Sequence, residues 1–175
     1  MNFDSKMTSS ISTLDDDRVA GEELLQLAVF FVGSNRYGID IMRIKRVIQA
    51  SPYPILRIPL APSIVEGVIT LRGVVIPVID LRHRFGVEID PSIERFNKLI
   101  IISVRGHIVS FKVDRVYGEI RIPIDTIRPA PALFAVDHSG AKGCFSGICK
   151  TAEGVVFILD TDRLTRITNS TEEAP

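Results

Sequence analysis

The sequence predicts an all-β protein, either a barrel or a sandwich. Three observations favour this class. Hydrophobic residues make up 46% of the chain, there is no Trp, and the apolar bulk comes from Val, Ile and Leu. The apolar runs are short and are cut by Gly, Pro and Asn. The two halves of the chain also align with each other. A length of 175 residues allows one domain, or two small ones that share a core.

The first half contains five apolar segments. Residues 42–48 are ambiguous between a strand and a short helix, and residues 51–63 hold four prolines, which predicts a loop that touches a strand edge near Leu56–Ile58. A hairpin is expected around Arg72 and Gly73. Asp80 is expected to cap a helical turn that Gly86 closes. The predicted strands and turn are Leu24–Val32, Tyr37–Ile41, Val65–Leu71, Val74–Ile79 and the helical turn Leu81–Phe85.

The second half predicts a similar series. A turn is expected at Arg105 and Gly106, and a late hairpin around the letters TAEG. Asp160 is expected to cap a short helix at Thr161–Thr165. The predicted strands are Leu99–Val104, Ile108–Val113, Val116–Ile122, Phe145–Lys150 and Val155–Leu159.

An ungapped alignment indicates an internal repeat. Residues 27–44 match residues 99–116 at an offset of 72, and residues 67–80 match residues 147–160 at an offset of 80. Apolar positions coincide, and the Gly-to-Asp spacing is the same in both copies. The alternative is that any two strand-rich halves align to some extent. The second copy carries an eight-residue insertion, since the offset grows by that amount.

Charge, cysteine and targeting features place limits on the class of protein. Residues 1–23 carry six acidic against two basic side chains and, like residues 168–175, are predicted to be flexible tails. The body is mildly basic, short of the concentrated footprint of a nucleic-acid binder. Cys144 and Cys149 form no CxxC motif. With neither a signal segment nor a membrane-length apolar run, we expect a cytoplasmic protein with reduced thiols.

Motifs for catalysis or metal binding are not recognisable, so the sequence predicts no enzyme activity, no cofactor and no metal. His83, His107 and His138 stand in no HExxH pattern, and neither GxSxG nor a Walker A motif occurs. Asp80 and Asp160 recur at the same place in both halves. Helix caps can be duplicated in this way more readily than catalytic acids, so we expect a structural role for both.

Nucleic-acid binding is a weaker alternative. It would need aromatic side chains on a basic face, whereas the aromatic residues of the strands are more simply explained as core. A basic cluster at Arg43, Lys45 and Arg46 is more often a solvated face. The aromatic residues in question are Phe30, Phe31, Phe111 and Phe157.

Arg72 is the one ionisable residue between Gly67 and Pro77. It is either an incidental turn charge or an anchor for a partner, since arginine is enriched at interface hot spots. In the second copy Ala152 occupies the matching position, so the fold does not require arginine there. This comparison favours a partner-facing or inter-barrel role.

Several stretches together resemble the CheW family of bacterial chemotaxis adaptors. They are YGIDIMRIKRVI at 37–48, RIPLAPSIVEGVITLRGVVIPVIDLRHRFG at 57–86, FKVDRVYGEIRI at 111–122, IRPAP at 127–131 and GVVFILDTDRL at 154–164. The resemblance covers residues 24–166 and includes the signature elements Gly67, Leu71-Arg72-Gly73, Pro77 and Asp80-Leu81.

The resemblance implies a mostly β fold of two packed SH3-like five-stranded β-barrel subdomains, intertwined and spanning roughly 24–95 and 96–167 of a CheW-like domain at 24–167. It implies a non-enzymatic adaptor that couples the cytoplasmic signalling tips of chemoreceptors to the regulatory domain of a CheA-type histidine kinase. An adaptor of a parallel chemosensory pathway is an alternative. The implied partner-binding residues are Ile44, Arg46, Gly67, Thr70 and Arg72.

Two of these residues depart from the family pattern. The family commonly has Glu at the position of Arg46, which reverses a charge, and Asn at the position of Thr70. Both departures favour a partner that differs from the usual one. The reversed charge at Arg46 motivates the alternative of a parallel pathway, for instance one that governs pili or surface behaviour.

Overall fold

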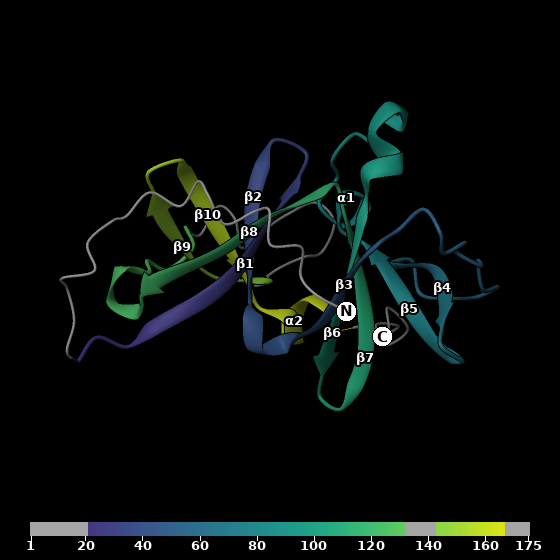
Figure 1. The fold of residues 1–175 in the computed structure, drawn as a ribbon, viewed down its shortest axis with the longest axis horizontal. Coiled ribbons are helices and arrows are strands. Elements are labelled where there is room, and N and C mark those ends of the chain that lie inside the picture. The colour runs from purple at the N-terminus through teal and green to yellow at the C-terminus, as the bar shows by residue number, and fades with distance from the viewer. Residues whose placement is uncertain (1–20, 132–142, 167–175) are drawn as a thin grey trace, which may run out of the picture.

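The computed structural model describes residues 21–131 and 143–166, so both expected tails lie almost entirely outside the described residues. The described chain consists of ten strands with short helices between them (Figure 1). The strands are β1 Leu24–Val32, β2 Asn35–Asp40, β3 Ile44–Gln49, β4 Val65–Leu71, β5 Val74–Asp80, β6 Lys98–Val104, β7 His107–Val113, β8 Arg115–Pro123, β9 Phe145–Thr151 and β10 Gly154–Leu159.

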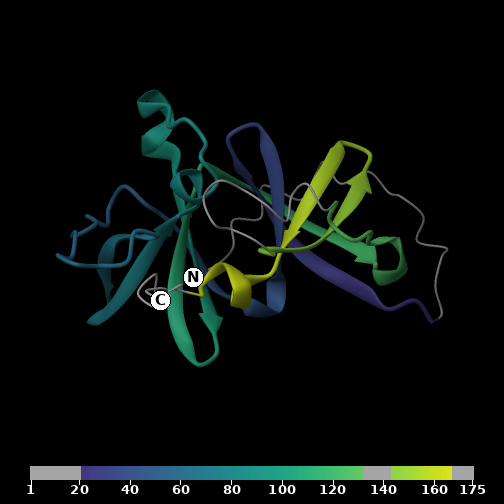
Figure 2. The same cartoon turned by 180° about the vertical axis from the view of Figure 1, so that it is seen from behind.

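The strands form two five-stranded sheets. Sheet 1 has the order β8-β1-β2-β10-β9, and sheet 2 has the order β3-β6-β7-β5-β4. Both views show the sheets side by side along the long axis of the molecule (Figures 1 and 2). The predicted mostly β, two-unit fold is confirmed, although each sheet is open, with an edge strand at either side.

The expected division of the chain near residue 95 does not separate the sheets. Hairpin β1–β2 belongs to the first half but pairs with β8 and β10 of the second half. Strands β6 and β7 belong to the second half but pair with β3 and β5 of the first. Neither sheet is therefore built from one half of the chain alone, because the two halves exchange their hairpins.

The predicted repeat is confirmed by the strand order. Replacing each strand of sheet 1 by its repeat equivalent gives the order of sheet 2. The isolated bridges also correspond, since Leu56 pairs with Val68 and Arg128 pairs with Ile148. The first bridge confirms the predicted contact of the proline-rich loop with a strand edge. The molecule therefore consists of two copies of one five-stranded unit that interlock.

The short helices begin where the sequence predicts. Helix α1 spans Leu81–Arg84, and Asp80 caps it by accepting a hydrogen bond from the backbone N–H of Arg82 at 2.9 Å. Helix α2 spans Thr161–Leu164, and Asp160 accepts from the N–H of Arg163 at 3.0 Å. The capping roles are confirmed. The described residues also contain three 3₁₀ helices: η1 Ile41–Arg43, η2 Pro91–Phe96 and η3 Ile124–Thr126.

Three apolar cores hold the sheets together. One lies within sheet 1 around Leu27 and Val156, and one lies within sheet 2 around Ile69 and Leu99. The largest is shared, because side chains of β1, β2 and β10 pack with those of β5, β6 and β7. Each buried Ile, Leu or Phe stabilises the fold by about 1.5–3 kcal/mol. The shared core contains Phe30, Val32, Tyr37, Ile39, Ile79, Leu81, Ile100, Ile102, Val104, Phe111, Val113, Cys144, Leu159 and Leu164.

The aromatic residues agree with the core interpretation. Phe30 and Phe111 are fully buried, Phe31 is buried, and Phe157 packs against the shared core. None of the four forms an exposed stacking platform. These four residues therefore do not supply the exposed aromatic face that nucleic-acid binding would have needed.

Candidate functional site

The β4–β5 hairpin presents Arg72 at its tip. Arg72 and Gly73 have φ angles of 50° and 79°, the pair of positive values that characterises a type I′ turn. The strands continue into it with Leu71 opposite Val74 and Thr70 opposite Val75. Gly or Asn fits the first position of such a turn more easily than arginine does. The turn geometry therefore gives no reason for the arginine side chain.

The surroundings of Arg72 are apolar and open. Val74 and Val75 beside it are 53% and 62% exposed. Within the described part of the chain, Arg72 makes no hydrogen bond or ion pair. The Arg72 guanidinium has no charge partner among the described residues and lies next to exposed valines. This position therefore offers both the polar and the apolar contacts that arginine makes at interfaces.

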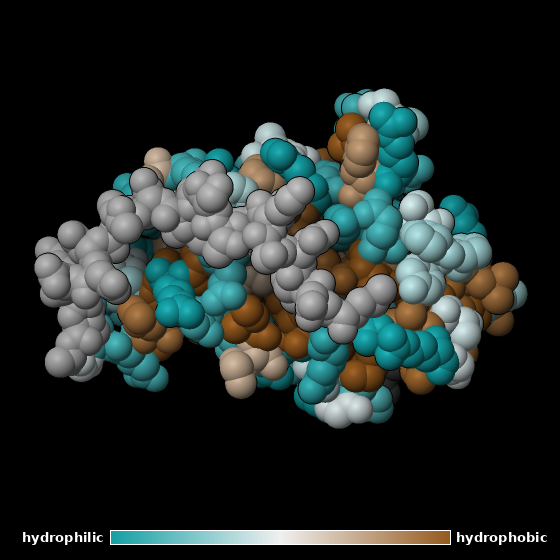
Figure 3. Space-filling view, in the orientation of Figure 1, coloured by the Kyte–Doolittle hydropathy of each residue, from teal (hydrophilic) through white to brown (hydrophobic). Residues whose placement is uncertain are grey.

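The proline-rich segment before β4 adds further apolar surface. Leu56, Ile58 and Leu60 are 70%, 45% and 104% exposed. Leu60 also has a φ of 61°, a left-handed conformation that leucine rarely adopts. Apolar residues gather at the β4–β5 end of the space-filling view (Figure 3, right). The sequence signal for this surface was the series of apolar residues between prolines, which we had interpreted only as a loop.

Gly67 is buried in β4 and lies under that segment. The backbone of Leu56 exchanges two hydrogen bonds of 2.8 Å with Val68. A Cβ atom on Gly67 would approach the carbonyl oxygen of Leu56 to 2.4 Å and Cγ2 of Ile55 to 2.8 Å. Glycine at this position allows the proline-rich segment to pair with the edge of β4. Gly67 therefore supports the exposed surface from below.

Ile44 and Arg46 lie on β3, the opposite edge of sheet 2. Ile44 is half-buried and packs against the shared core, whereas Arg46 is exposed. The five predicted site residues thus fall into two groups on the two edge strands of one sheet, Ile44 and Arg46 on β3, and Gly67, Thr70 and Arg72 on β4 and its turn.

The corresponding hairpin of sheet 1 is held by its own side chains. Glu153, in the β9–β10 turn, accepts a hydrogen bond from Arg36 through its backbone carbonyl, and its carboxylate lies 3.9 Å from the guanidinium. The Arg36 guanidinium also lies 5.4 Å from the ring of Phe31 and 5.8 Å from that of Tyr117. A hydrogen bond to Glu153 raises the pKa of Tyr117. The hairpin of sheet 1 is therefore held where that of sheet 2 is free.

A buried charge cluster lies where α1 meets both sheets. The side chain of Arg82 is 1% exposed and donates hydrogen bonds of 3.0 and 2.8 Å to Asp80. It also lies 3.6 Å from Asp114 and 3.5 Å from Glu94. Burial alone would lower the pKa of Arg82, but the bonds and charges of these carboxylates raise it. Sequence reasoning had not singled out this arginine.

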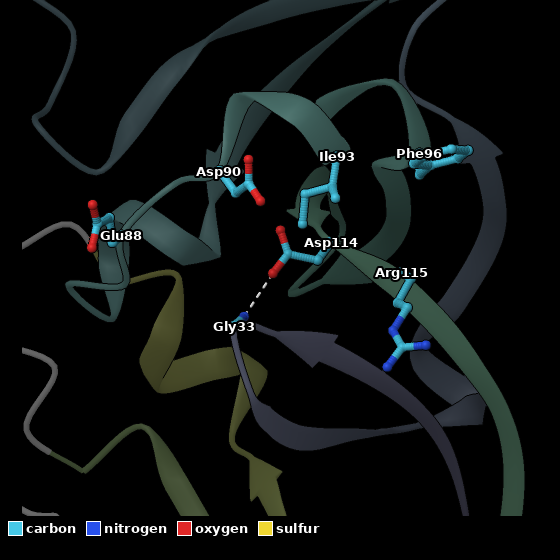
Figure 4. Close-up of a pocket in the computed structure, with 7 residues that line it drawn as sticks. All are labelled: Gly33, Glu88, Asp90, Ile93, Phe96, Asp114 and Arg115. Atoms are coloured by element: carbon cyan, nitrogen blue, oxygen red, sulfur yellow. Dashed lines mark hydrogen bonds between the residues drawn. The ribbon is translucent and has the colours of Figure 1, made fainter.

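Asp114 connects the charge cluster to sheet 1. Its carboxylate accepts a 2.6 Å hydrogen bond from the backbone N–H of Gly33 in the β1–β2 turn. Figure 4 shows this bond at the rim of a hollow of about 470 Å³. The hollow is lined by Gly33, Glu88, Asp90, Ile93, Phe96, Asp114 and Arg115. The bond between Asp114 and Gly33 at its rim joins the two sheets.

Across residues 21–131 and 143–166, no group of three or more His, Cys, Asp or Glu side chains is arranged to hold a metal ion. In the same residues no helix is long and apolar enough to cross a membrane.

The fold contains two interlocked copies of a five-stranded sheet. In sheet 1 the hairpin is held by its own side chains, whereas the end of sheet 2 presents exposed apolar and cationic side chains. Such a protein offers surfaces for docking. Comparison with known proteins identifies the family. The model of the CheW-like domain matches residues 26–168. The chain belongs to the CheW-like domain family.

Individual relatives agree with this assignment. The chemotaxis protein CheW of Klebsiella aerogenes is 30% identical over 148 residues, which cover 84% of this chain and 86% of that protein. The chemotaxis protein CheW of Helicobacter pylori is 28% identical over 162 residues, covering 93% and 92%. The solved structure of the scaffolding protein TtCheW from Thermoanaerobacter tengcongensis matches with a TM-score of 0.73 and 30% identity, over 83% of this chain and 95% of that one.

Proposed function

We propose that this chain is a non-enzymatic chemotaxis adaptor that couples chemoreceptors to a CheA-type histidine kinase. One observation carries the proposal beyond family membership. The exposed end of sheet 2 combines a free guanidinium with uncovered apolar side chains, while at the equivalent hairpin of sheet 1 the guanidinium of Arg36 is paired with Glu153. A fold built from two copies does not need this difference, so it is best explained by a partner that covers sheet 2.

We assign the kinase regulatory domain to the β4–β5 end, and the cytoplasmic signalling tip of a chemoreceptor to the β3 side. Arg72 would contribute the anchor, with Thr70 and the neighbouring valines around it. Gly67 would act indirectly by supporting the proline-rich segment. Ile44 and Arg46 lie at the other edge, which lets one sheet hold two partners at once. The adaptor would work in the cytoplasm, where these partners are found.

Co-purification tests the proposal directly. The purified chain should retain both a CheA-type regulatory domain and a receptor signalling segment, and the three should form a ternary complex on gel filtration. Failure to bind either protein would contradict the assignment. A gel shift with nucleic acid at physiological ionic strength would instead support the nucleic-acid alternative.

Arg46 gives a specific reason to test a second adaptor role. It is exposed, and its charge is opposite to that commonly found in the family. An adaptor of a parallel chemosensory pathway would prefer a different kinase. Binding to each CheA-like kinase of the same cell, measured side by side, distinguishes the two roles through the rank order of affinities.

A further inference from the structure

The segment that connects α1 to β6 turns apolar side chains outward. It contains η2, which projects from the body of the molecule at the upper right of Figure 1. Ile89, Ile93 and Phe96 are 38%, 38% and 52% exposed, and apolar atoms are visible on this projection in Figure 3. We call these three side chains the η2 patch. Apolar side chains gathered at the surface in this way are typical of an interaction site.

Ion pairs and hydrogen bonds hold η2 to the body. Glu94 lies 3.5 Å from the buried guanidinium of Arg82 and 3.9 Å from the ammonium group of Lys112. The side-chain amide of Gln49 donates a 2.6 Å hydrogen bond to the backbone carbonyl of Arg95. The segment is thus anchored through Glu94 and its backbone. Its exposed apolar side chains are therefore presented in a fixed position, which lowers the cost of binding another surface.

Charged residues flank the η2 patch with one sign on each side. Figure 4 shows Glu88 and Asp90 on one side of the hollow beside η2 and Arg115 on the other, with apolar side chains between them. Phe96 lies on the side of Arg115, and the guanidinium of Arg95 is 4.6 Å from the centre of its ring. The patch therefore has an acidic flank and a basic flank.

The four flanking groups are exposed and uncompensated. Among residues 21–131 and 143–166, none of them forms an ion pair. Asp114, the other charged residue that lines the hollow, is already engaged with Gly33 and Arg82. Two acids and two bases thus face solvent. A partner of one charge sign would meet like charge on one flank, whereas a surface that carries both signs would not.

We propose that the η2 patch is the contact surface of a homodimer, with a second copy of this chain as its occupant. A two-fold interface uses the same surface on both copies. The axis would place the acidic flank of each copy opposite the basic flank of the other. The apolar side chains would meet at the centre inside a charged rim, the usual arrangement of an interface.

This inference goes beyond the adaptor function and does not depend on it. The η2 patch contains none of the residues assigned above to the kinase regulatory domain or to the receptor tip. Dimer formation therefore does not compete with either partner for the same side chains. It would let one assembly carry two copies of each docking surface.

The first test measures mass against concentration for the purified chain alone. Sedimentation velocity from about 5 to 500 µM, a range suited to weak interfaces, should show wild type changing from monomer to dimer. Phe96→Asp should raise the dissociation constant of the dimer about tenfold or more, because it places a charge at the centre of the contact. Val155→Asp, at an exposed valine of sheet 1, is the matched control and should stay within about twofold of wild type.

Circular dichroism establishes that each variant is folded, and Ile93→Asp replaces Phe96→Asp if that variant is not. A wild type that stays monomeric over the whole range would overturn the proposal. So would a dimer that a folded Phe96→Asp or Ile93→Asp variant leaves unchanged. Because no partner protein is present, neither result bears on the adaptor function.

A pair of charge variants tests the two-fold arrangement itself. Glu88→Arg with Asp90→Asn makes the acidic flank basic while an amide still caps η2. Arg95→Glu with Arg115→Glu makes the basic flank acidic. Each variant alone should be monomeric where wild type is dimeric, because like charges then face each other. An equimolar mixture of the two should form a heterodimer, since every acidic flank again meets a basic one. A mixture that stays monomeric would contradict the arrangement.

Discussion

Sheets 1 and 2 share one strand order, one bulge and one edge bridge, yet their ends differ in chemistry. In sheet 1 the hairpin tip and the bulge residue are tied together by Arg36, Glu153 and Tyr117. The equivalent positions in sheet 2 are Ile108, Gly73 and Lys45, which cannot form such a network. The difference teaches that the fold is satisfied by either arrangement, so the exposed charges of sheet 2 require another explanation.

The two junctions between the sheets, at helices α1 and α2, also differ in chemistry. Arg82 in α1 and Asp162 in α2 occupy equivalent positions, with opposite charges. Arg82 is buried among carboxylates, whereas the side chain of Asp162 is 35% exposed and pairs with Arg43 and Arg105, which are themselves 43% and 53% exposed. Because the junction at Arg82 is buried, removing one of its charges should destabilise the fold strongly. Removing a charge at the exposed junction of Asp162 should have little effect on stability.

The largest expected effect is at the buried junction. Arg82→Met removes the guanidinium and leaves Asp80 and Asp114 buried without their cation. We expect a loss of about 3–5 kcal/mol in the free energy of unfolding, because an unpaired buried charge is costly. Asp162→Asn at the exposed junction should cost less than about 1 kcal/mol. Urea unfolding monitored by circular dichroism measures both, and similar costs would show that the junctions are not distinct.

The two equivalent glycines give a smaller effect. Gly67→Ala brings a Cβ to 2.4 Å from the carbonyl oxygen of Leu56, and Gly147→Ala brings one to 2.8 Å from that of Arg128. Each should lower the free energy of unfolding by about 1–3 kcal/mol, since the backbone segment above must shift.

Binding separates the two glycine variants. Gly67→Ala should also weaken capture of the kinase regulatory domain, because it displaces the segment that carries Leu56 and Leu60. Gly147→Ala, which is equally destabilised, serves as the control. Equal binding by the two variants would argue against a docking role for the proline-rich segment.

The smallest effect concerns the network that closes sheet 1. The hydrogen bond and charge of Glu153 raise the pKa of Tyr117, so Glu153→Ala should lower that pKa toward the ordinary tyrosine value. Ultraviolet titration of phenolate formation measures it. The pKa of Tyr37, which burial raises, should not change. An unchanged titration of Tyr117 would mean that the hairpin of sheet 1 is not tied in this way.

Much of the fold could be predicted from the sequence because its information is local. Strand β1 has the predicted bounds, since Gly33 ends a continuous apolar run, and Asp80 and Asp160 mark where the helices begin. The exchange of hairpins could not be predicted. An internal alignment shows which strands are equivalent, but hairpin β1–β2 can satisfy the same hydrogen bonds in either half of the chain.

The site was predictable to a lesser degree. Comparison of Arg72 with Ala152 already indicated that the arginine is not needed for the turn, and its lack of a partner among the described residues agrees with this. The exposure of Lys45 depends on a bulge, and the burial of Arg82 depends on which surfaces meet. Both are properties of pairing register and tertiary packing, which the apolar periodicity of a sequence does not reveal.

One measurement tests the central claim, that the free end of sheet 2 is a docking surface. Arg72→Glu and Ala152→Glu place the same side chain at equivalent positions of the two hairpins, both of which are exposed. Calorimetry with the kinase regulatory domain should show at least about a tenfold loss of affinity for Arg72→Glu. Ala152→Glu should bind within about twofold of wild type. Unchanged binding by a folded Arg72→Glu variant, or an equal loss in both variants, would contradict the account.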